Sequence, residues 1–181
     1  MRLRAPVRNA WWRLRGSGIR NPPVPSTVNS ILFVCLGNIC RTPFGAEIAK
    51  RLLAQAGRSD VRCTSAGIRP SRNKRSPDDA CRASLAYGVS LNDHRPQVLT
   101  RELMESHDVV VVMEWWHLAH LRAAYPELHD RIVLLSLLDD EASSAYERYH
   151  IADPWGQPIA AFDECYRRMD RILRRWLAVQ R

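Results

Sequence analysis

The sequence has no long apolar run, and this absence restricts the classes of protein that it can represent. No segment approaches the roughly 18 to 20 consecutive apolar residues that a membrane-spanning helix requires. The start of the chain also lacks the apolar block of about 7 to 15 residues that marks a secretory signal peptide. We therefore expect a soluble protein in the cytoplasm. Its 181 residues, 46% of them hydrophobic, suffice for one compact domain with a substantial core.

Cysteine is scarce and lacks the spacing of a disulfide framework or of a common metal site. The five cysteines form an odd number and include no Cys-x-x-Cys pair. Structural disulfides are therefore not expected in a chain without an export signal. His117 and His120 are three residues apart, but no cluster of cysteines or carboxylates completes a zinc site. We predict no metal and no cofactor.

Acidic residues are missing from residues 1–29, although the formal charge of the whole chain is +8. This segment holds six arginines, so the remainder has 21 basic and 19 acidic residues and is nearly neutral. A protein that binds duplex nucleic acid normally has a basic face among its ordered elements, and we therefore expect no nucleic-acid partner. Pro22, Pro23 and Pro25 further indicate that residues 1–29 are a basic, mostly disordered extension before a domain at residues 30–181.

Trp11 and Trp12 lie among the arginines of this extension. Basic segments with interfacial aromatic residues can contact an anionic membrane surface, so such contact is one hypothesis for the extension. The alternative is a solvated tail without a function of its own, and this is the interpretation that we favour.

Buried strands and amphipathic helices alternate along the rest of the chain. The predicted strands lie at residues 31–34, 61–65, 109–113 and 132–135. The predicted helices lie at residues 42–57, 76–88, 115–125 and 159–179. This alternation predicts an α/β fold, a doubly wound four-stranded parallel sheet with helices on both faces. Ligands of such sheets bind at the carboxyl ends of the strands, so the segment after the first strand is the expected site.

That segment has the features of a phosphate-binding loop. Residues 35–43 read Cys-Leu-Gly-Asn-Ile-Cys-Arg-Thr-Pro, and Thr42 and Pro43 suit the N-cap and first turn of a helix. Such a loop aims unpaired N–H groups and the positive end of the helix dipole at one point, which favours an oxyanion. Arg41 adds a planar fork that can hold two phosphate oxygens. The residues predicted to bind phosphate are Leu36, Gly37, Asn38, Ile39, Cys40 and Arg41.

Cys35 is the predicted nucleophile, because the groups that bind phosphate in this loop also stabilise a thiolate. Thr42 can donate its hydroxyl proton to that sulfur, or it can serve only as a helix N-cap. Asn38 can brace the loop through its amide, or it can be a plain turn residue. Cys40 could form a disulfide with Cys35 on oxidation, or it could be a small buried hydrophobic residue. The cysteines assigned to the core are Cys63, Cys81 and Cys165.

Residues 34–43 closely resemble the signature loop of the low-molecular-weight protein tyrosine phosphatases, which usually have Ser at the position of Thr42. The resemblance covers about residues 30–181. It includes Thr-Ser-Ala-Gly at 64–67, the segment around His94, Val-Met-Glu at 112–114 and Asp-Pro-Trp at 153–155. It implies the same four-stranded parallel fold and a phosphatase that hydrolyses phosphotyrosine without a metal.

The resemblance also implies a role for each matching residue. Cys35 would attack the phosphorus and form a cysteinyl-phosphate, while Arg41 holds the phosphate oxygens. Asp153 would protonate the leaving phenol and then deprotonate the water that hydrolyses the intermediate. The supporting residues that it implies are Thr42, Ser65 and His94, with Trp155 as a wall of the substrate pocket.

Two further positions depart from the family pattern. The family normally has Tyr at the position of Trp155, and many members have a second aromatic wall near Ser71. Bacterial members without that second wall often act on the tyrosine-rich tails of kinases that control exopolysaccharide assembly, and Ser71 places this chain with them by resemblance. A phosphorylated tail would be attracted to a basic rim, although a solvated charge run is the alternative. The rim residues are Arg69, Arg72, Lys74 and Arg75.

Two other functions remain as alternatives. An arsenate reductase on the same fold would need a further cysteine pair near the middle of the chain, and residues 82–164 contain no cysteine. A phosphotyrosine-binding module without activity would not need Cys35, Arg41 and Asp153 together. We therefore favour the phosphatase.

Overall fold

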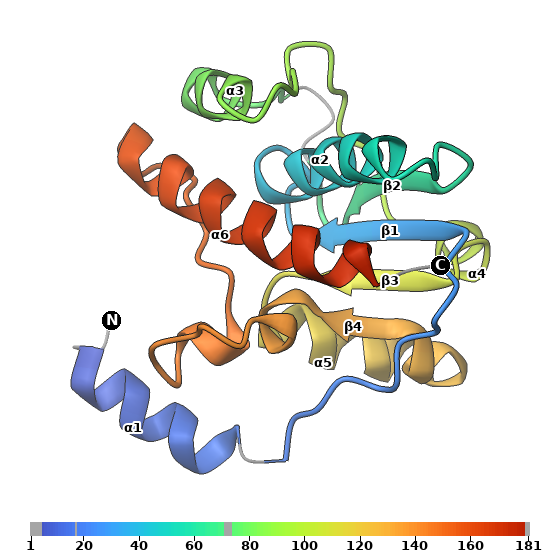
Figure 1. Ribbon diagram of the computed structural model, residues 1–181. Helices are drawn as coiled ribbons and strands as arrows, with labels where there is room; N and C mark the ends of the chain where they lie inside the picture. Colours follow the sequence, from blue (N-terminus) through green and yellow to red (C-terminus); the bar gives the residue numbers. More distant parts are fainter. Residues whose placement is uncertain (1–4, 17, 71–73, 180–181) are drawn as a thin grey trace.

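The computed structural model describes residues 5–16, 18–70 and 74–179. Its centre is a sheet of four parallel strands in the order β2-β1-β3-β4 (Figure 1). The strands are β1 (Ser30–Cys35), β2 (Arg62–Gly67), β3 (Val109–Val112) and β4 (Ile132–Leu134). The four strands and their parallel pairing confirm the prediction from the sequence.

Helices cover both faces of this sheet. In Figure 1, α2 and α6 lie in front of the sheet and α5 lies behind it. The helices of the front face are α2 (Arg41–Gln55), α3 (Asp78–Leu85) and α6 (Ile159–Ala178). The far face carries α1 (Ala5–Arg15), α4 (Arg101–Glu105) and α5 (Trp115–Ala124). Within the described residues, no helix combines the length and the apolar character that crossing a membrane requires.

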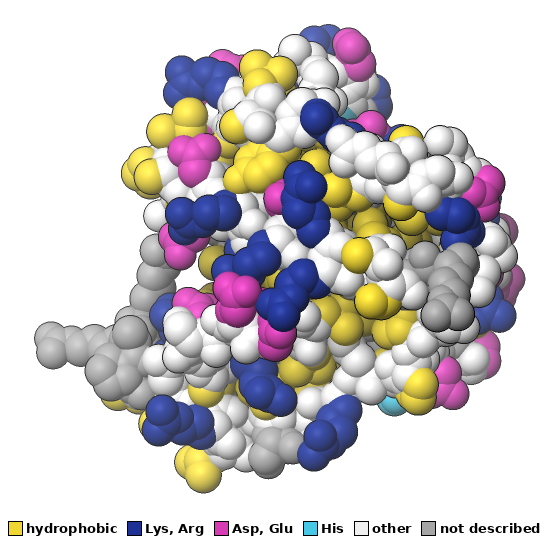
Figure 2. Space-filling view, viewed as in Figure 1, with side chains coloured by type: hydrophobic (Ala, Val, Ile, Leu, Met, Phe, Trp, Pro, Cys, Tyr) yellow, Lys and Arg dark blue, Asp and Glu magenta, His cyan; other side chains and the backbone are white. Residues whose placement is uncertain are grey.

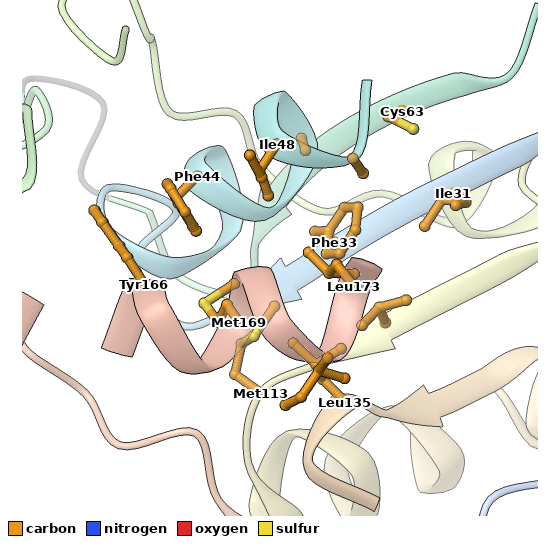
Figure 3. Packing of buried hydrophobic residues seen from close by; sticks show 14 of the residues in the cluster. Ile31, Phe33, Phe44, Ile48, Cys63, Met113, Leu135, Tyr166, Met169 and Leu173 are labelled. Atoms are coloured by element: carbon orange, nitrogen blue, oxygen red, sulfur yellow. The ribbon is translucent and has the colours of Figure 1, made fainter. Parts of the chain in front are cut away.

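Strand β1 is buried on both faces because its side chains alternate between two cores. Ile31 and Phe33 belong to the core beneath α2 and α6, whereas Leu32 and Val34 belong to the core on the other face. Figure 3 shows Phe33 in the first core, beside side chains from α2, α6 and the ends of β3 and β4. This explains the unbroken apolar run in the sequence. It also fixes the position of Cys35, the residue at the carboxyl end of β1.

The start of α2 differs from the prediction. The helix begins at Arg41, with Cys40 at the N-cap position and no side-chain cap. Thr42 is therefore inside the first turn, and the prediction that it caps the helix is wrong. Its hydroxyl group lies 3.3 Å from Cys35 Sγ, so a tertiary contact replaces the local capping bond. The expected stop at Gly57 is confirmed, because this residue has a positive φ of 78°.

Helix α1 contradicts the disorder that was expected of the N-terminal extension for residues 5–15. Trp12 of this helix is 7% exposed and belongs to the core on the far face of the sheet. The basic composition of this segment predicts too little apolar burial to order the chain. The burial of the Trp12 side chain supplies the free energy that orders α1. The boundary between residues 29 and 30 stays a prediction.

A buried ion-pair network joins α6 to the segments that follow β4, which include the 3-10 helices η2 (Leu135–Leu138) and η3 (Glu147–Tyr149). The side chain of Asp139 is 1% exposed and accepts hydrogen bonds from Arg168 Nε and Arg171 Nη2 at 2.7 and 2.8 Å. Arg168 also donates to the backbone oxygens of Glu147 and His150. Figure 2 shows basic and acidic side chains side by side over α6. The network thus fixes residues 147–150 against α6.

Replacement of Asp139 by Asn should lower the free energy of unfolding by about 1–3 kcal/mol at pH 7, because two arginines lose their buried partner. Burial alone would raise the pKa of Asp139, but the hydrogen bonds from Arg168 and Arg171 hold this pKa below its ordinary value. The stabilisation is therefore present above the unfolded pKa of about 3.9 and is lost as the pH falls through the lower folded pKa. Urea unfolding between pH 7 and pH 3 measures it. The exposed neighbour provides the control: Asp140→Asn should change stability by less than about 0.5 kcal/mol.

Candidate active site

The loop between β1 and α2 forms the floor of a pocket of about 210 Å³ at the carboxyl end of the sheet. Residues 35–41 line this pocket together with Arg69, Lys74, Asp153 and Trp155. The pocket lies where the fold rule for parallel sheets places a ligand site. It also brings Cys35, Arg41 and Asp153 together, although Asp153 is more than 100 residues away in the sequence.

Cys35 Sγ receives two polar contacts at the floor of the pocket. The backbone N–H of Asn38 donates to this sulfur at 3.4 Å, and Thr42 Oγ1 lies 3.3 Å from it. Asn38 Nδ2 in turn donates to Thr42 Oγ1 at 3.0 Å. Because that bond occupies a lone pair of the hydroxyl oxygen, the hydroxyl proton is left to donate to the sulfur. Both contacts stabilise negative charge on Cys35, as a thiolate nucleophile requires.

Asn38 holds the loop in shape from inside the protein. It is fully buried and has a positive φ of 53°, which Asn tolerates better than most residues. Its amide nitrogen also donates to Ser65 Oγ at 2.9 Å, and its amide oxygen accepts from the backbone N–H of Gln97 at 3.0 Å. The Asn38 carbonyl oxygen lies 2.7 Å from His94 Nε2. The structure thus brings the predicted supporting residues Ser65 and His94 together on Asn38.

The His94 ring nitrogen must carry a proton to bond a carbonyl oxygen, and burial lowers the pKa of His94 despite the hydrogen bond to Asn38. Gln97 was missed by the sequence reasoning, although its side chain also donates to the Ser65 carbonyl oxygen at 2.6 Å. It lies in an irregular loop, where no periodicity or motif marks a functional position.

Arg41 is a buried cation held by two carboxylates. Its side chain is 2% exposed, and Nη1 donates to Glu114 Oε1 at 2.6 Å and to the Ile151 carbonyl oxygen at 2.9 Å. Nη2 lies 3.0 Å from Asp153 Oδ2. Burial would lower the pKa of Arg41, but the nearby Cys35, Asp153 and Glu114 raise it further above its ordinary value. The sequence marks Glu114 only as the last residue of the Val-Met-Glu motif, because its contact with Arg41 depends on the fold.

Asp153 and Trp155 form the outer part of the pocket. The Asp153 side chain is 46% exposed, and Trp155 is 54% exposed. The backbone N–H of Trp155 donates to Asp153 Oδ1 at 3.3 Å, and Lys74 Nζ lies 5.1 Å from the centre of the Trp155 ring. Of the predicted basic rim, Arg69 and Lys74 line the pocket and Arg75 is exposed. Ser71 and Arg72 lie outside the described residues.

The remaining cysteines are not exposed nucleophiles. Cys40 is 3% exposed, and burial raises its pKa well above the ordinary value. Burial also raises the pKa values of Cys63 and Cys165 to about 12, whereas Cys81 is only partly buried. These positions fit the assignment of Cys63 and Cys165 to the core. The disulfide between Cys35 and Cys40 stays a prediction.

Comparison with known proteins agrees with the geometry of this site. A family model described as low molecular weight phosphotyrosine protein phosphatase matches residues 30–181. The low molecular weight protein-tyrosine-phosphatase Etp of Escherichia coli K12 is 33% identical over 150 residues, which are 82% of this chain and 92% of Etp. The structure of the tyrosine phosphatase Wzb from Escherichia coli K30, in complex with sulphate, superposes with a TM-score of 0.73 at 29% identity, covering 84% of this chain and 98% of Wzb.

An arginine phosphatase has a similar structure. YwlE from Geobacillus stearothermophilus superposes with a TM-score of 0.70 at 25% identity, covering 83% of this chain and 91% of YwlE. Phosphatases for two kinds of phosphorylated side chain, tyrosine and arginine, therefore share this architecture. The residues that line the pocket distinguish the two substrates.

Replacement of Asn38 separates the two properties of this residue. Asn38→Ala loses the amide hydrogen bonds and places an alanine at a positive φ, and we expect a loss of about 2–4 kcal/mol in the free energy of unfolding. Asn38→Gly loses the same bonds but accepts the backbone angle, and its loss should be smaller by about 1 kcal/mol. Urea unfolding measures both values, and inorganic phosphate binding by calorimetry should weaken in the same order. Equal behaviour of the two variants would show that the backbone angle carries no cost.

Proposed function

The chain belongs to the low molecular weight phosphotyrosine protein phosphatase family and is a protein-tyrosine phosphatase, and we propose that Cys35, Arg41 and Asp153 carry out its reaction. The observation that carries this assignment of roles is the environment of Cys35. Its sulfur lies at the floor of a loop that directs an N–H group and a hydroxyl group toward it, beside the buried Arg41. A phosphate that enters this pocket meets the nucleophile and its binding groups at the same point.

The contacts of Arg41 indicate how it meets phosphate. Glu114 and the Ile151 carbonyl oxygen occupy Nη1, so Nε and Nη2 are the edge that can face an oxyanion. In the structure, Nη2 contacts Asp153. A phosphate that binds this edge replaces the Asp153 carboxylate, which is then free to move toward the leaving-group oxygen.

The reaction proceeds in two steps. Cys35 Sγ attacks phosphorus, the bond between phosphorus and the phenol oxygen breaks, and protonated Asp153 gives its proton to that oxygen. The cysteinyl-phosphate is then hydrolysed when Asp153 takes a proton from water, which attacks phosphorus and releases Cys35. The loop N–H groups and Arg41 stabilise the equatorial oxygens in both steps.

The pocket favours an aryl phosphate over phosphoarginine. Leu36, Ile39 and Trp155 give its wall an apolar surface on which a phenyl ring can pack. A guanidinium group would instead lie in a pocket lined by Arg69 and Lys74, whose like charges repel it. We therefore assign phosphotyrosine as the substrate of this chain.

Replacement of Asp153 by Asn should have an effect that depends on the leaving group. Aryl phosphates with poor leaving groups need protonation, and their kcat/KM should fall by about 10² to 10⁴. Phosphates with good leaving groups need little help, and their kcat/KM should stay near the parent value, because kcat/KM reports only the steps up to phosphorylation of Cys35, before Asp153 acts as a base. Steady-state kinetics on a series of substituted phenyl phosphates measures the difference.

Two further measurements complete this experiment. Cys35→Ser should abolish turnover of every substrate in the series and still bind inorganic phosphate, because the loop and Arg41 remain. The parent protein should hydrolyse a phosphotyrosine peptide much faster than a phosphoarginine peptide. A uniform loss in Asp153→Asn across the series would contradict its assignment as general acid.

We further propose that the physiological substrate is the phosphorylated, tyrosine-rich tail of a bacterial tyrosine kinase, one that controls exopolysaccharide assembly. Arg69 and Lys74 at the pocket, with the exposed Arg75, support a polyanionic partner. Each phosphotyrosine carries a charge of about −1.5 to −2 at neutral pH, so several on one tail would be attracted together. A cytoplasmic location is part of this proposal, because a reducing compartment keeps the Cys35 thiol active.

Charge attraction predicts a difference in salt dependence. Added salt should slow hydrolysis of a multiply phosphorylated tyrosine peptide far more than hydrolysis of phenyl phosphate. A triple variant with Ser at Arg69, Lys74 and Arg75 should lose this difference. The matched control removes three exposed arginines that do not line the pocket, Arg82, Arg101 and Arg174, and it should keep the difference. Equal salt dependence of both substrates in the parent protein would refute the proposal.

A further inference from the structure

Helix α1 precedes the residues that match the family, yet it packs on the chain that leads into Asp153. The ring centre of Trp12 lies 4.4 Å from that of His150, 5.3 Å from that of Tyr149 and 5.7 Å from that of Trp115. Figure 1 shows α1 beside the irregular segment between β4 and α6. This helix is therefore a neighbour of the catalytic segment.

Polar contacts hold the middle of α1 and the residue that follows it to the same segment. The Tyr149 hydroxyl group donates to the carbonyl oxygen of Gly16 at 2.6 Å. The backbone N–H of Tyr146 donates to Asn9 Oδ1 at 3.2 Å, and the Arg8 guanidinium carbon lies 3.8 Å from the centre of the Tyr146 ring. Together with Trp12, these contacts fix residues 146–150 from one side, whereas Arg168 fixes them from the side of α6.

The residues that Trp12 contacts adjoin the groups that hold Arg41. His150 precedes Ile151, whose carbonyl oxygen accepts from Arg41 Nη1, and Trp115 follows Glu114, the other acceptor of Nη1. The backbones of Glu114 and His150 are also joined by an antiparallel bridge. A shift of Trp12 would therefore reach both acceptors of Arg41: it would reach Glu114 through Trp115, and Ile151 through His150.

The loop that carries Asp153 has open space behind it. A cavity of about 690 Å³ lies between this loop, α6 and α1, and its lining includes Asp153, Pro154 and Arg8. A loop beside such a cavity lacks dense packing on that side. Its position must therefore depend on its fixed neighbours at residues 146–151, which α1 supports.

We propose that α1, chiefly through Trp12, is a positioning element that sets the place of Asp153 relative to the substrate phosphate. The proposal rests on the function of Asp153 as general acid and extends it to a helix outside the family region. Trp12 does not touch the reacting atoms. It acts through the segment that it packs against, and a displacement of that segment by about 1 Å is enough to weaken proton transfer.

Replacement of Trp12 by Ala in the full-length protein tests the proposal. The kcat/KM for aryl phosphates with poor leaving groups should fall by about 10-fold, and the kcat/KM for good leaving groups should change little. Trp12→Phe should restore most of the lost rate, because it keeps a packed ring. Leu14→Ala on the same helix is the control. Leu14 is 82% exposed, so its replacement should leave all rates unchanged.

A second pair of variants disturbs the contact between α1 and residues 146–150 at Tyr149 instead of at Trp12. A Cβ atom at Gly16 would overlap the ring of Tyr149, so Gly16→Ala must displace this ring. At Gly18, a Cβ atom would meet none of the described residues within 4 Å. Gly16→Ala should therefore reproduce the leaving-group effect of Trp12→Ala, and Gly18→Ala should not. This pair decides the proposal if Trp12→Ala fails to fold.

The double variant with Asp153→Asn separates this proposal from the assignment of the general acid. If Asp153 is the acid and α1 acts through it, Trp12→Ala should cause no further loss with poor leaving groups in that background. A uniform loss for all leaving groups in Trp12→Ala and Gly16→Ala would show that α1 acts through Arg41 or through the fold as a whole and not through Asp153, and unchanged rates would show that it does not position the site. Either result overturns the proposal. Absence of a leaving-group effect in Asp153→Asn itself would instead refute the acid assignment.

Discussion

The buried charge of Arg41 is the constraint on which the rest of the site depends. A cation at 2% exposure is stable only if carboxylates and carbonyl oxygens replace its water, and the protein supplies them from two distant segments. Glu114 follows β3, and Ile151 and Asp153 lie in the irregular chain before α6. The contacts of Arg41 thus connect the residues that follow β1 and β3 to the segment that carries Asp153, the proposed acid.

The loop and the outer pocket hold their functional groups in different ways. The loop residues next to Cys35 are fixed by buried hydrogen bonds, most of them made by Asn38. Asp153, in contrast, is half exposed and contacts Arg41 on the edge that a phosphate oxygen would take. A nucleophile must be aligned before substrate arrives, whereas an acid must reach a leaving group that arrives with the substrate. The two kinds of environment suit these two tasks.

The sequence predicted those parts of the structure that local rules control. The strand before Cys35 could be recognised because both of its faces are buried, which leaves an unbroken apolar run. The role of Thr42 in capping was predicted wrongly, because a hydroxyl at a helix start can bond the local backbone or a distant sulfur, and only the fold decides. Gln97 and Glu114 could not be identified for the same reason, since their partners are more than 30 residues away. Helix α1 was missed because its stability comes from the burial of Trp12 and not from its composition.

The departure at Thr42 has a physical consequence for the nucleophile. A serine at this position could turn its hydroxyl group through three rotamers, whereas the branched Cβ of threonine restricts χ1. Thr42 is fully buried, so its methyl group is held by packing while its hydroxyl group is held between Asn38 and Cys35. The extra methyl group thus favours the χ1 rotamer in which the hydroxyl group reaches the sulfur of Cys35. Thr42 therefore fixes the direction of a hydrogen bond to the sulfur of Cys35, the proposed nucleophile.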